Sequence, residues 1–300
     1  MTSVLLTGAT GYVGGRLAPL LARDAAAPDD LRCLVRDPAR LPSALRPHAV
    51  QGDALSGAGL AEALGGVDVA YYLIHSMGGG SGEDFAARDE RAADTFGRAA
   101  AAAGVRRVIY LGGLSGGDAD ASSAHLRSRE QVAEVLARHV PQFVHVRAAM
   151  VIGAGGASFE MLRALVRRLP AMVCPRWIDT RTQPIAVDDV VAALRALSVR
   201  DDITGDVELG GPDALSYREM MVRTARTMGR RPPLIVRVPV LTPRLSSYWV
   251  MLVTPVEAGL VRPLVDGLRE EMVVRTPPPA GINDAPLGFD AAVRAALAER

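Results

Sequence analysis

The sequence predicts an α/β protein built on a doubly wound parallel sheet, the Rossmann fold, with a small C-terminal lobe on the substrate side. Three observations predict it. A strand at the N-terminus runs into a glycine-rich turn, strand-like and helical stretches alternate through the first half, and strict alternation stops beyond Gly153. The 300 residues, 49% of them hydrophobic, are enough for a full core. We expect a Rossmann core in residues 1–152 with 184–211, and the lobe in residues 153–183 with 212–300.

The N-terminal stretch predicts a dinucleotide site. Apolar or β-tolerant residues 4–7 lead into three glycines spaced G-x-x-G-x-x-G, and leucines at helical spacing follow. Such a turn brings the backbone close to a pyrophosphate, which then faces the N-terminus of a helix. An ordinary glycine-rich turn is the alternative, but the position between strand and helix favours the cofactor site. The residues assigned to this turn are Gly8, Thr10, Gly11, Tyr12, Val13 and Gly14.

The elements that follow alternate in type. Residues 31–36, 49–53, 67–74 and 107–111 have the apolar character of buried strands, whereas residues 58–64 and 85–104 have helical periodicity. Alternation of this kind predicts parallel strands joined by right-handed crossovers.

The end of the second strand indicates which dinucleotide binds. An acidic residue there holds the ribose 2′-hydroxyl of NAD, whereas arginine accommodates the 2′-phosphate of NADP. The strand ends in Arg36, and Arg40 follows one turn later, so we expect NADP(H); Asp37 keeps NAD open as the alternative. Asp53 and Ala54, after the third strand, are assigned to the adenine side, although Gly-Asp is also common in turns.

Composition excludes several classes of function. The formal net charge is +1, so no global field attracts nucleic acid or an anionic membrane, and every basic residue is arginine. Cys33 and Cys174 have neither metal-ligand spacing nor a disulfide framework. No signal segment and no apolar run long enough to span a bilayer is present. We expect a cytoplasmic monomer or homodimer. It should bind a small-molecule substrate but neither a metal nor nucleic acid.

The motifs TGATGYVGG, LVRDP at the second strand, GD at the third and YLGGL at the fifth resemble those of an atypical extended short-chain dehydrogenase/reductase. Within that superfamily the chain is most similar to the NAD(P)H-binding and NmrA-like proteins. Residues 144–149, 182–190 and 209–212 also resemble late elements of the family, so the likeness spans most of the chain.

The chain departs from the family where the chemistry is expected. Members use Tyr-x-x-x-Lys after the fifth strand, and this chain has no lysine. His125 and Arg129 stand four residues apart at about that place, so His125 is our candidate acid/base and Arg129 a candidate partner of the ribose hydroxyls. The alternative is that His125 merely begins a helix beside the cofactor. Ser115 is a candidate donor to the substrate oxygen, although serine is ordinary in a glycine-rich loop.

Further candidates lie at strand ends, because the carboxyl edge of a parallel sheet forms the ligand crevice. Leu73 and His75 follow the fourth strand, ahead of the Gly78–Gly80 run that suggests a flap, and Arg147 and Ala149 end the sixth. The apolar candidates for a substrate pocket, most of them expected in the core, are Phe159, Met161, Met172, Trp177, Tyr248, Trp249 and Met251.

These observations favour an NAD(P)H-dependent oxidoreductase acting on a small, apolar carbonyl or alcohol. A non-catalytic NADP(H)-binding redox sensor or regulator is the main alternative, and a structural role in a larger assembly is a third.

Overall fold

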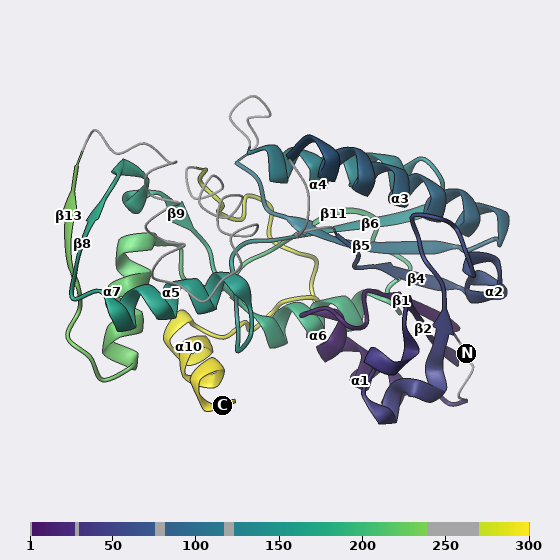
Figure 1. Ribbon diagram of the computed structural model, residues 1–300, viewed down its shortest axis with the longest axis horizontal. Helices are drawn as coiled ribbons and strands as arrows, with labels where there is room; N and C mark the ends of the chain where they lie inside the picture. The colour runs from purple at the N-terminus through teal and green to yellow at the C-terminus, as the bar shows by residue number, and fades with distance from the viewer. Residues whose placement is uncertain (1, 28–29, 76–81, 117–122, 239–269, 300) are drawn as a thin grey trace.

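The computed structural model describes residues 2–27, 30–75, 82–116, 123–238 and 270–299. Its centre is a seven-stranded parallel sheet with the strand order β11-β6-β5-β4-β1-β2-β3 (Figure 1). The strands of this sheet are β1 Val4–Thr7, β2 Leu31–Val35, β3 Ala49–Gln51, β4 Val69–Tyr72, β5 Arg107–Gly113, β6 Gln142–Ala148 and β11 Gly205–Leu209. The predicted Rossmann fold is confirmed.

Helices cover both faces of the sheet because its central strands, such as β1 and β4, are buried on both sides. Alternate residues of one strand enter different cores: Leu6 and Tyr71 pack toward α1 (Gly14–Asp24) and α6 (Val187–Leu197). Leu5 and Tyr72 pack toward the opposite layer. The helices of that layer are α2 Leu60–Leu64, α3 Gly82–Ala102 and α4 Ala124–Ala137.

A third core lies beyond the carboxyl end of β6 (Figure 1). It is built around helices α5 (Ala157–Arg168), α7 (Tyr217–Thr227) and α10 (Phe289–Ala298). Phe159 is fully buried there, and Met161 and Met172 are also buried, so these pocket candidates are packed among core side chains. Tyr248, Trp249, Met251 and the glycine run 78–80 lie outside the described residues.

Small two-stranded sheets complete this part of the chain. They pair β7 with β10, β9 with β12, and β8 with β13. Their bounds are β7 Val151–Ile152, β8 Ala171–Cys174, β9 Arg181–Thr182, β10 Ile185–Ala186, β12 Leu215–Ser216 and β13 Leu234–Arg237. Three short 3-10 helices are Pro38–Arg40, Ser43–His48 and Arg176–Asp179.

The order of the sheet fixes where a ligand would bind. β1 lies between β2 and β4, and the connections leave its two sides in opposite directions. In open α/β sheets the crevice forms at this switch point, outside the carboxyl ends of the strands. A ligand site is therefore expected at the turn after β1 and the loops after β4, β5 and β6.

Candidate dinucleotide site and its catalytic edge

The turn after β1 is packed so tightly that two of its glycines admit no side chain. Gly8 has a φ of 71°, and a Cβ atom there would stand 2.5 Å from the carbonyl oxygen of Leu73. A Cβ on Gly14 would stand 2.2 Å from the Gly8 carbonyl oxygen. Both distances are far below van der Waals contact. The helix therefore starts directly against the end of its own strand, beside the chain that leaves β4.

Gly11 is different because its open side faces solvent. Its N–H donates to the Gly8 carbonyl at 2.8 Å, while a Cβ there would meet only that same oxygen, at 3.1 Å. Thr10 and Gly11 are exposed. The first N–H groups of any helix lack partners inside it and carry the positive end of its dipole. The open space beside Gly11, in front of the start of α1 at Gly14, thus forms a cradle that fits a pyrophosphate.

The Tyr12 side chain turns away from this cradle. Its hydroxyl is buried against Gly153, where a Cβ would stand only 2.3 Å from it, and among the described residues it has no hydrogen-bond partner. Burial raises the pKa of Tyr12 to about 12. The Arg16 guanidinium lies 5.4 Å from the ring centroid, donates to the Ala154 carbonyl at 3.0 Å and pairs with Glu299. This arrangement joins the cofactor turn to the C-terminal part of the chain.

The end of β2 carries exposed positive charge. Arg36 and Arg40 are exposed, and neither contacts an acidic side chain among the described residues. The Asp37 carboxylate accepts the Ala39 N–H at 3.0 Å and so caps the short 3-10 helix. The two exposed guanidiniums are groups that fit a 2′-phosphate, whereas Asp37 uses only its Oδ1 in capping the helix.

Asp53 stabilises its own loop. One of its carboxylate oxygens, Oδ1, accepts the N–H groups of Leu55 at 2.7 Å and Ser56 at 3.2 Å. Ala54 is buried beside it. The second carboxylate oxygen, Oδ2, makes no hydrogen bond within the described residues and is available to an adenine amino group.

The segment after β4 passes beside the glycine turn. The Leu73 N–H donates to the Thr7 hydroxyl at 3.0 Å, and that hydroxyl donates to the Tyr71 carbonyl at 2.9 Å. These bonds tie the exit of β4 to the end of β1. They place Leu73, and His75 two residues later, at the rim of the cradle.

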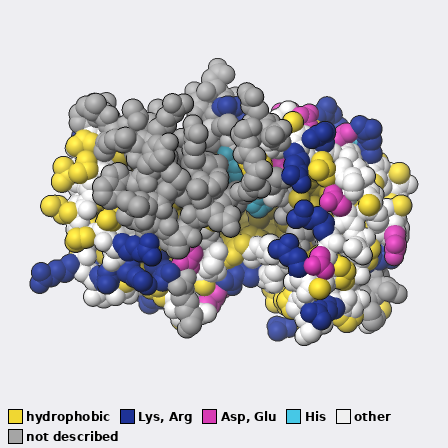
Figure 2. Space-filling view, in the orientation of Figure 1, with side chains coloured by type: hydrophobic (Ala, Val, Ile, Leu, Met, Phe, Trp, Pro, Cys, Tyr) yellow, Lys and Arg dark blue, Asp and Glu magenta, His cyan; other side chains and the backbone are white. Residues whose placement is uncertain are grey.

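His75, which follows β4, lies close enough to His125 and Arg129 of α4 for their charges to act on it. His125 and Arg129 lie on α4, where Ser123 caps the helix by accepting the Leu126 N–H. The positive charge of Arg129 is the main reason that the pKa of His75 falls well below its usual value. Arg129 also approaches the Tyr110 hydroxyl at 3.5 Å. Figure 2 shows histidine side chains within the hollow near the middle of the molecule.

His125 is neutral at physiological pH in this environment. Burial, with a further contribution from Arg129, lowers its pKa from 6.5 to about 4. A pKa near 4 leaves only a small imidazolium fraction to donate a proton at neutral pH, and it also makes the neutral imidazole a weak base. The arrangement therefore suits proton donation to a carbonyl at acidic pH better than proton abstraction from an alcohol.

This lowered pKa predicts how stability responds to acid. The unfolded imidazole binds a proton below its ordinary pKa of 6.5, whereas the folded one does so only near 4, so the unfolded state binds more protons in this window. We expect the free energy of unfolding to fall as pH drops from 6.5 toward 4, with His75 acting in the same direction. Urea titrations at several pH values should show a shallower fall for His125→Gln. An unchanged slope in that variant would contradict the buried neutral imidazole.

Ser115 and Arg147 contact each other. Arg147 Nη2 donates to the Ser115 hydroxyl and to Glu130, both at 2.6 Å, and Nη1 contacts Asp206 at 3.2 Å. The side chain is 16% exposed. A guanidinium held in this way orients the Ser115 hydroxyl rather than standing free beside a ligand. Ala149 is buried, and its N–H donates to the Leu209 carbonyl at 3.3 Å.

Sequence reasoning missed the other members of this network. Asp206 also pairs with His145 Nδ1 at 3.3 Å, and the His145 ring stacks on Tyr110 with centroids 5.3 Å apart. Residues 145 and 147 share one face of β6 by strand alternation, a signal that would have linked them. Strand alternation could not predict that Asp206 and Glu130 belong to this network. Asp206 reaches Arg147 because β11 pairs with β6, and Glu130 reaches it because α4 packs nearby.

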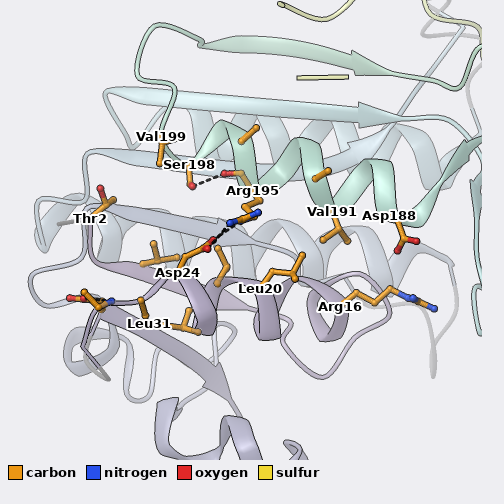
Figure 3. Close-up of a pocket in the computed structure, with 17 residues that line it drawn as sticks. Thr2, Arg16, Leu20, Asp24, Leu31, Asp188, Val191, Arg195, Ser198 and Val199 are labelled. Carbon is orange, nitrogen blue, oxygen red and sulfur yellow. Dashed lines mark hydrogen bonds and ion pairs between the residues drawn. The ribbon is translucent and has the colours of Figure 1, made fainter. Parts of the chain in front are cut away.

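A groove that runs along α1 and α6 is a separate feature. It has a volume of about 860 Å³, lies between α1 and α6, and is bordered by the ion pair between Arg195 and Asp24 (Figure 3). None of the predicted cofactor residues lines it. Within the described ranges no cluster of side chains could hold a metal ion, and no helix is long and apolar enough to cross a membrane.

Comparisons with known proteins agree with this geometry. Residues 8–152 match a family described as NAD(P)H-binding. A ceramide reductase of Caulobacter vibrioides is 30% identical over 237 residues, which cover 77% of this chain and 72% of that protein.

Solved structures share the whole fold. An Escherichia coli NADPH-dependent quinone oxidoreductase complexed with NADPH has a TM-score of 0.76 at 19% identity, covering 97% of this chain and 98% of the other. A Citrobacter sp. triphenylmethane reductase complexed with NADP(H) has a TM-score of 0.74 at 16% identity, covering 98% and 99%. A nucleoside-diphosphate-sugar epimerase from Staphylococcus aureus has a TM-score of 0.75 at 18% identity, covering 98% and 100%. The chain belongs to the NAD(P)H-binding family.

Proposed function

We propose that this protein is an NADP(H)-dependent oxidoreductase that reduces a carbonyl group, or oxidises the matching alcohol, on an apolar metabolite. The observation that carries the proposal is the meeting of His75, His125 and Arg129 beside the glycine turn. Two imidazoles and a fixed cation at the carboxyl edge of the sheet supply a proton carrier and a polarising charge where a nicotinamide would lie. The substrate would enter between the core in residues 1–152 with 184–211 and the lobe in residues 153–183 with 212–300.

Each group has a distinct task in this proposal. The cradle from Gly8 to Gly14, including the Thr10, Tyr12 and Val13 backbone, would hold the pyrophosphate. Arg36 would hold the 2′-phosphate, and Asp53 with Ala54 would hold the adenine.

The bound nicotinamide supplies or accepts the hydride. His125 exchanges the proton with the substrate oxygen, and Arg129 contacts ribose hydroxyls. Ser115, oriented by Arg147, would donate to the substrate oxygen, and Leu73, His75 and Ala149 border the ring.

The apolar character of the substrate rests on the relative named ceramide reductase. The test is NADPH oxidation with methyl ketones of increasing chain length and with quinones, followed by the absorbance of the reduced nicotinamide. We expect turnover to rise with chain length. A purified, NADPH-binding protein that oxidises no NADPH with any of these compounds would contradict the enzymatic proposal.

One observation favours a second candidate, a non-catalytic NADP(H)-binding regulator. The chain has no lysine to assist a tyrosine, and the pKa of His125 is lowered to about 4, which leaves little imidazolium at neutral pH. A regulator would bind NADPH and NADP⁺ with different affinities without turning either over. Calorimetry with both forms, combined with the carbonyl panel, separates the two candidates.

Removing the Arg36 guanidinium should erase the preference for NADP(H). Arg36→Ala deletes a charged contact to the 2′-phosphate worth about 1.5–3 kcal/mol, or roughly ten- to a hundredfold in affinity. The affinity for NAD(H), which lacks this phosphate, should change little. Calorimetric titration of both cofactors measures the effect, and Arg138→Ala, an exposed arginine after α4, is the matched control. Equal affinities of the wild type for NADP(H) and NAD(H) would overturn the assignment.

A further inference from the structure

The two-stranded sheet of β8 and β13 exposes apolar side chains on its outer face. The strands are parallel, with Leu234 opposite Ala171 and Val236 opposite Val173. Residues paired in register share a face, so these four side chains form one surface. Val173 is 58% exposed, Leu234 66% and Val236 47%. We call these four residues the β8/β13 face.

The inner side of the same sheet explains why the strands form there. Met172 and Cys174 alternate with the outward residues of β8 and are buried in the third core. Parallel strands are normally covered on both faces, so an uncovered apolar outer face is unusual for this pair. Three of the five large apolar side chains that are exposed in the described part of the chain lie on the β8/β13 face. This concentration distinguishes the face from scattered surface residues.

Arginines without acidic neighbours border the face. Arg230 donates to the Arg167 carbonyl at 2.6 Å, and the Leu234 N–H donates to the Pro170 carbonyl at 2.9 Å. These bonds bring the end of α5 and the turn before β13 together at one end of the two strands. Arg167, Arg230 and Arg231 are exposed there. The sequence has no Asp or Glu in residues 161–178 or 220–256. Figure 2 shows apolar side chains along the left edge, where β8 and β13 lie, with basic side chains below them.

The acidic group that contacts the end of β13 is already paired. Asp179, at the end of the 3-10 helix that follows β8, contacts Arg218 at 2.9 Å and Arg237 at 3.1 Å. Arg231 contacts no acidic side chain of the residues that the structure describes. The border of the face is therefore net positive, although the whole protein is close to neutral.

We propose that the β8/β13 face docks on an anionic lipid surface. The apolar side chains would enter the boundary between headgroups and acyl chains, and Arg167, Arg230 and Arg231 would contact lipid phosphates, which guanidinium binds well. Charge argues against a second copy as the occupant, because a two-fold contact brings the same arginines of both copies together. The proposal is independent of the activity, although such docking would deliver an apolar substrate directly from the bilayer.

Vesicle flotation tests the proposal. We expect the purified full chain to float with vesicles of equal parts phosphatidylcholine and phosphatidylglycerol, and to stay in solution with pure phosphatidylcholine. An arginine beside an anionic surface contributes about fivefold in binding, so Arg230→Gln/Arg231→Gln should weaken partitioning by roughly thirtyfold. Val173→Thr/Leu234→Thr/Val236→Thr should abolish it. These changes keep β-compatible side chains on an exposed face, and circular dichroism checks the fold.

The matched control is Val199→Thr, which removes the most exposed of these apolar side chains, 73% exposed and far from the β8/β13 face. It should float as the wild type does. Equal flotation with neutral and anionic vesicles, no flotation at all, or arginine variants that bind like the wild type would each overturn the proposal. Self-association of the wild type without lipid would also overturn the proposal if it depended on protein concentration and was abolished by the triple threonine variant. A second copy of the chain would then cover the face.

Discussion

His125→Ala should slow NADPH-dependent carbonyl reduction by about 10²–10⁴-fold while leaving cofactor affinity nearly unchanged, because a positioned proton donor contributes rates of this size. The wild-type rate should increase as pH falls from neutrality toward the pKa of about 4, since the imidazolium fraction grows over that interval. Steady-state kinetics across pH, with binding measured separately by calorimetry, provide both readouts.

Two variants serve as controls for this prediction. Arg129→Ala should act mainly on cofactor affinity, as expected for a contact to ribose hydroxyls, and should raise the apparent pKa of His75 and His125 by removing a neighbouring positive charge. His139→Ala removes an imidazole that bonds Asp94 beyond the far end of α4 and should leave the rate unchanged. Full activity in His125→Ala would show that the proton comes from another group.

Gly11→Val should abolish dinucleotide binding in a protein that still folds. A Cβ at Gly11 meets only the Gly8 carbonyl oxygen, at 3.1 Å, so the turn itself yields slightly, whereas the added methyl groups occupy the exposed cradle. Calorimetry should detect no NADPH binding at concentrations that saturate the wild type, and circular dichroism should show the wild-type spectrum.

Neighbouring glycines provide the controls. A Cβ at Gly15 meets Ala9 at an ordinary 3.5 Å, so Gly15→Ala should keep both fold and binding. Gly14→Ala should lose stability first, because its Cβ would stand 2.2 Å from the Gly8 carbonyl oxygen. A folded Gly11→Val protein with normal NADPH affinity would place the pyrophosphate elsewhere.

Local sequence signals were sufficient to predict most strands of the central sheet. The second strand was expected at residues 31–36 and lies at Leu31–Val35; the fifth was expected at residues 107–111 and continues to Gly113. Strands buried on both faces are continuous apolar runs, which are visible without knowledge of their neighbours. The last core strand was expected around residues 209–212 but occupies Gly205–Leu209, where Asp206 and Glu208 interrupt the apolar pattern.

The candidate site also combines features that the local sequence predicts with features that depend on tertiary packing. The glycine turn is a local feature, so its spacing alone predicted its shape. The link between Ser115 and Arg147 depends on two strands lying side by side, and the approach of His75 to Arg129 depends on α4 packing over β5. Sequence spacing identified His125 and Arg129 as neighbours on one helix but gave no indication that burial would keep the imidazole neutral.

The position of β11 has a consequence for folding during synthesis. β11 pairs with β6 although more than fifty residues separate them, and its five residues form one edge of the sheet. Until residues 205–209 leave the ribosome, β6 is an edge strand whose N–H and C=O groups on one side have no partner. Edges of this kind invite pairing with other chains. A nascent chain stalled between β6 and β11 therefore exposes the edge of Gln142–Ala148 that β11 covers in the folded protein.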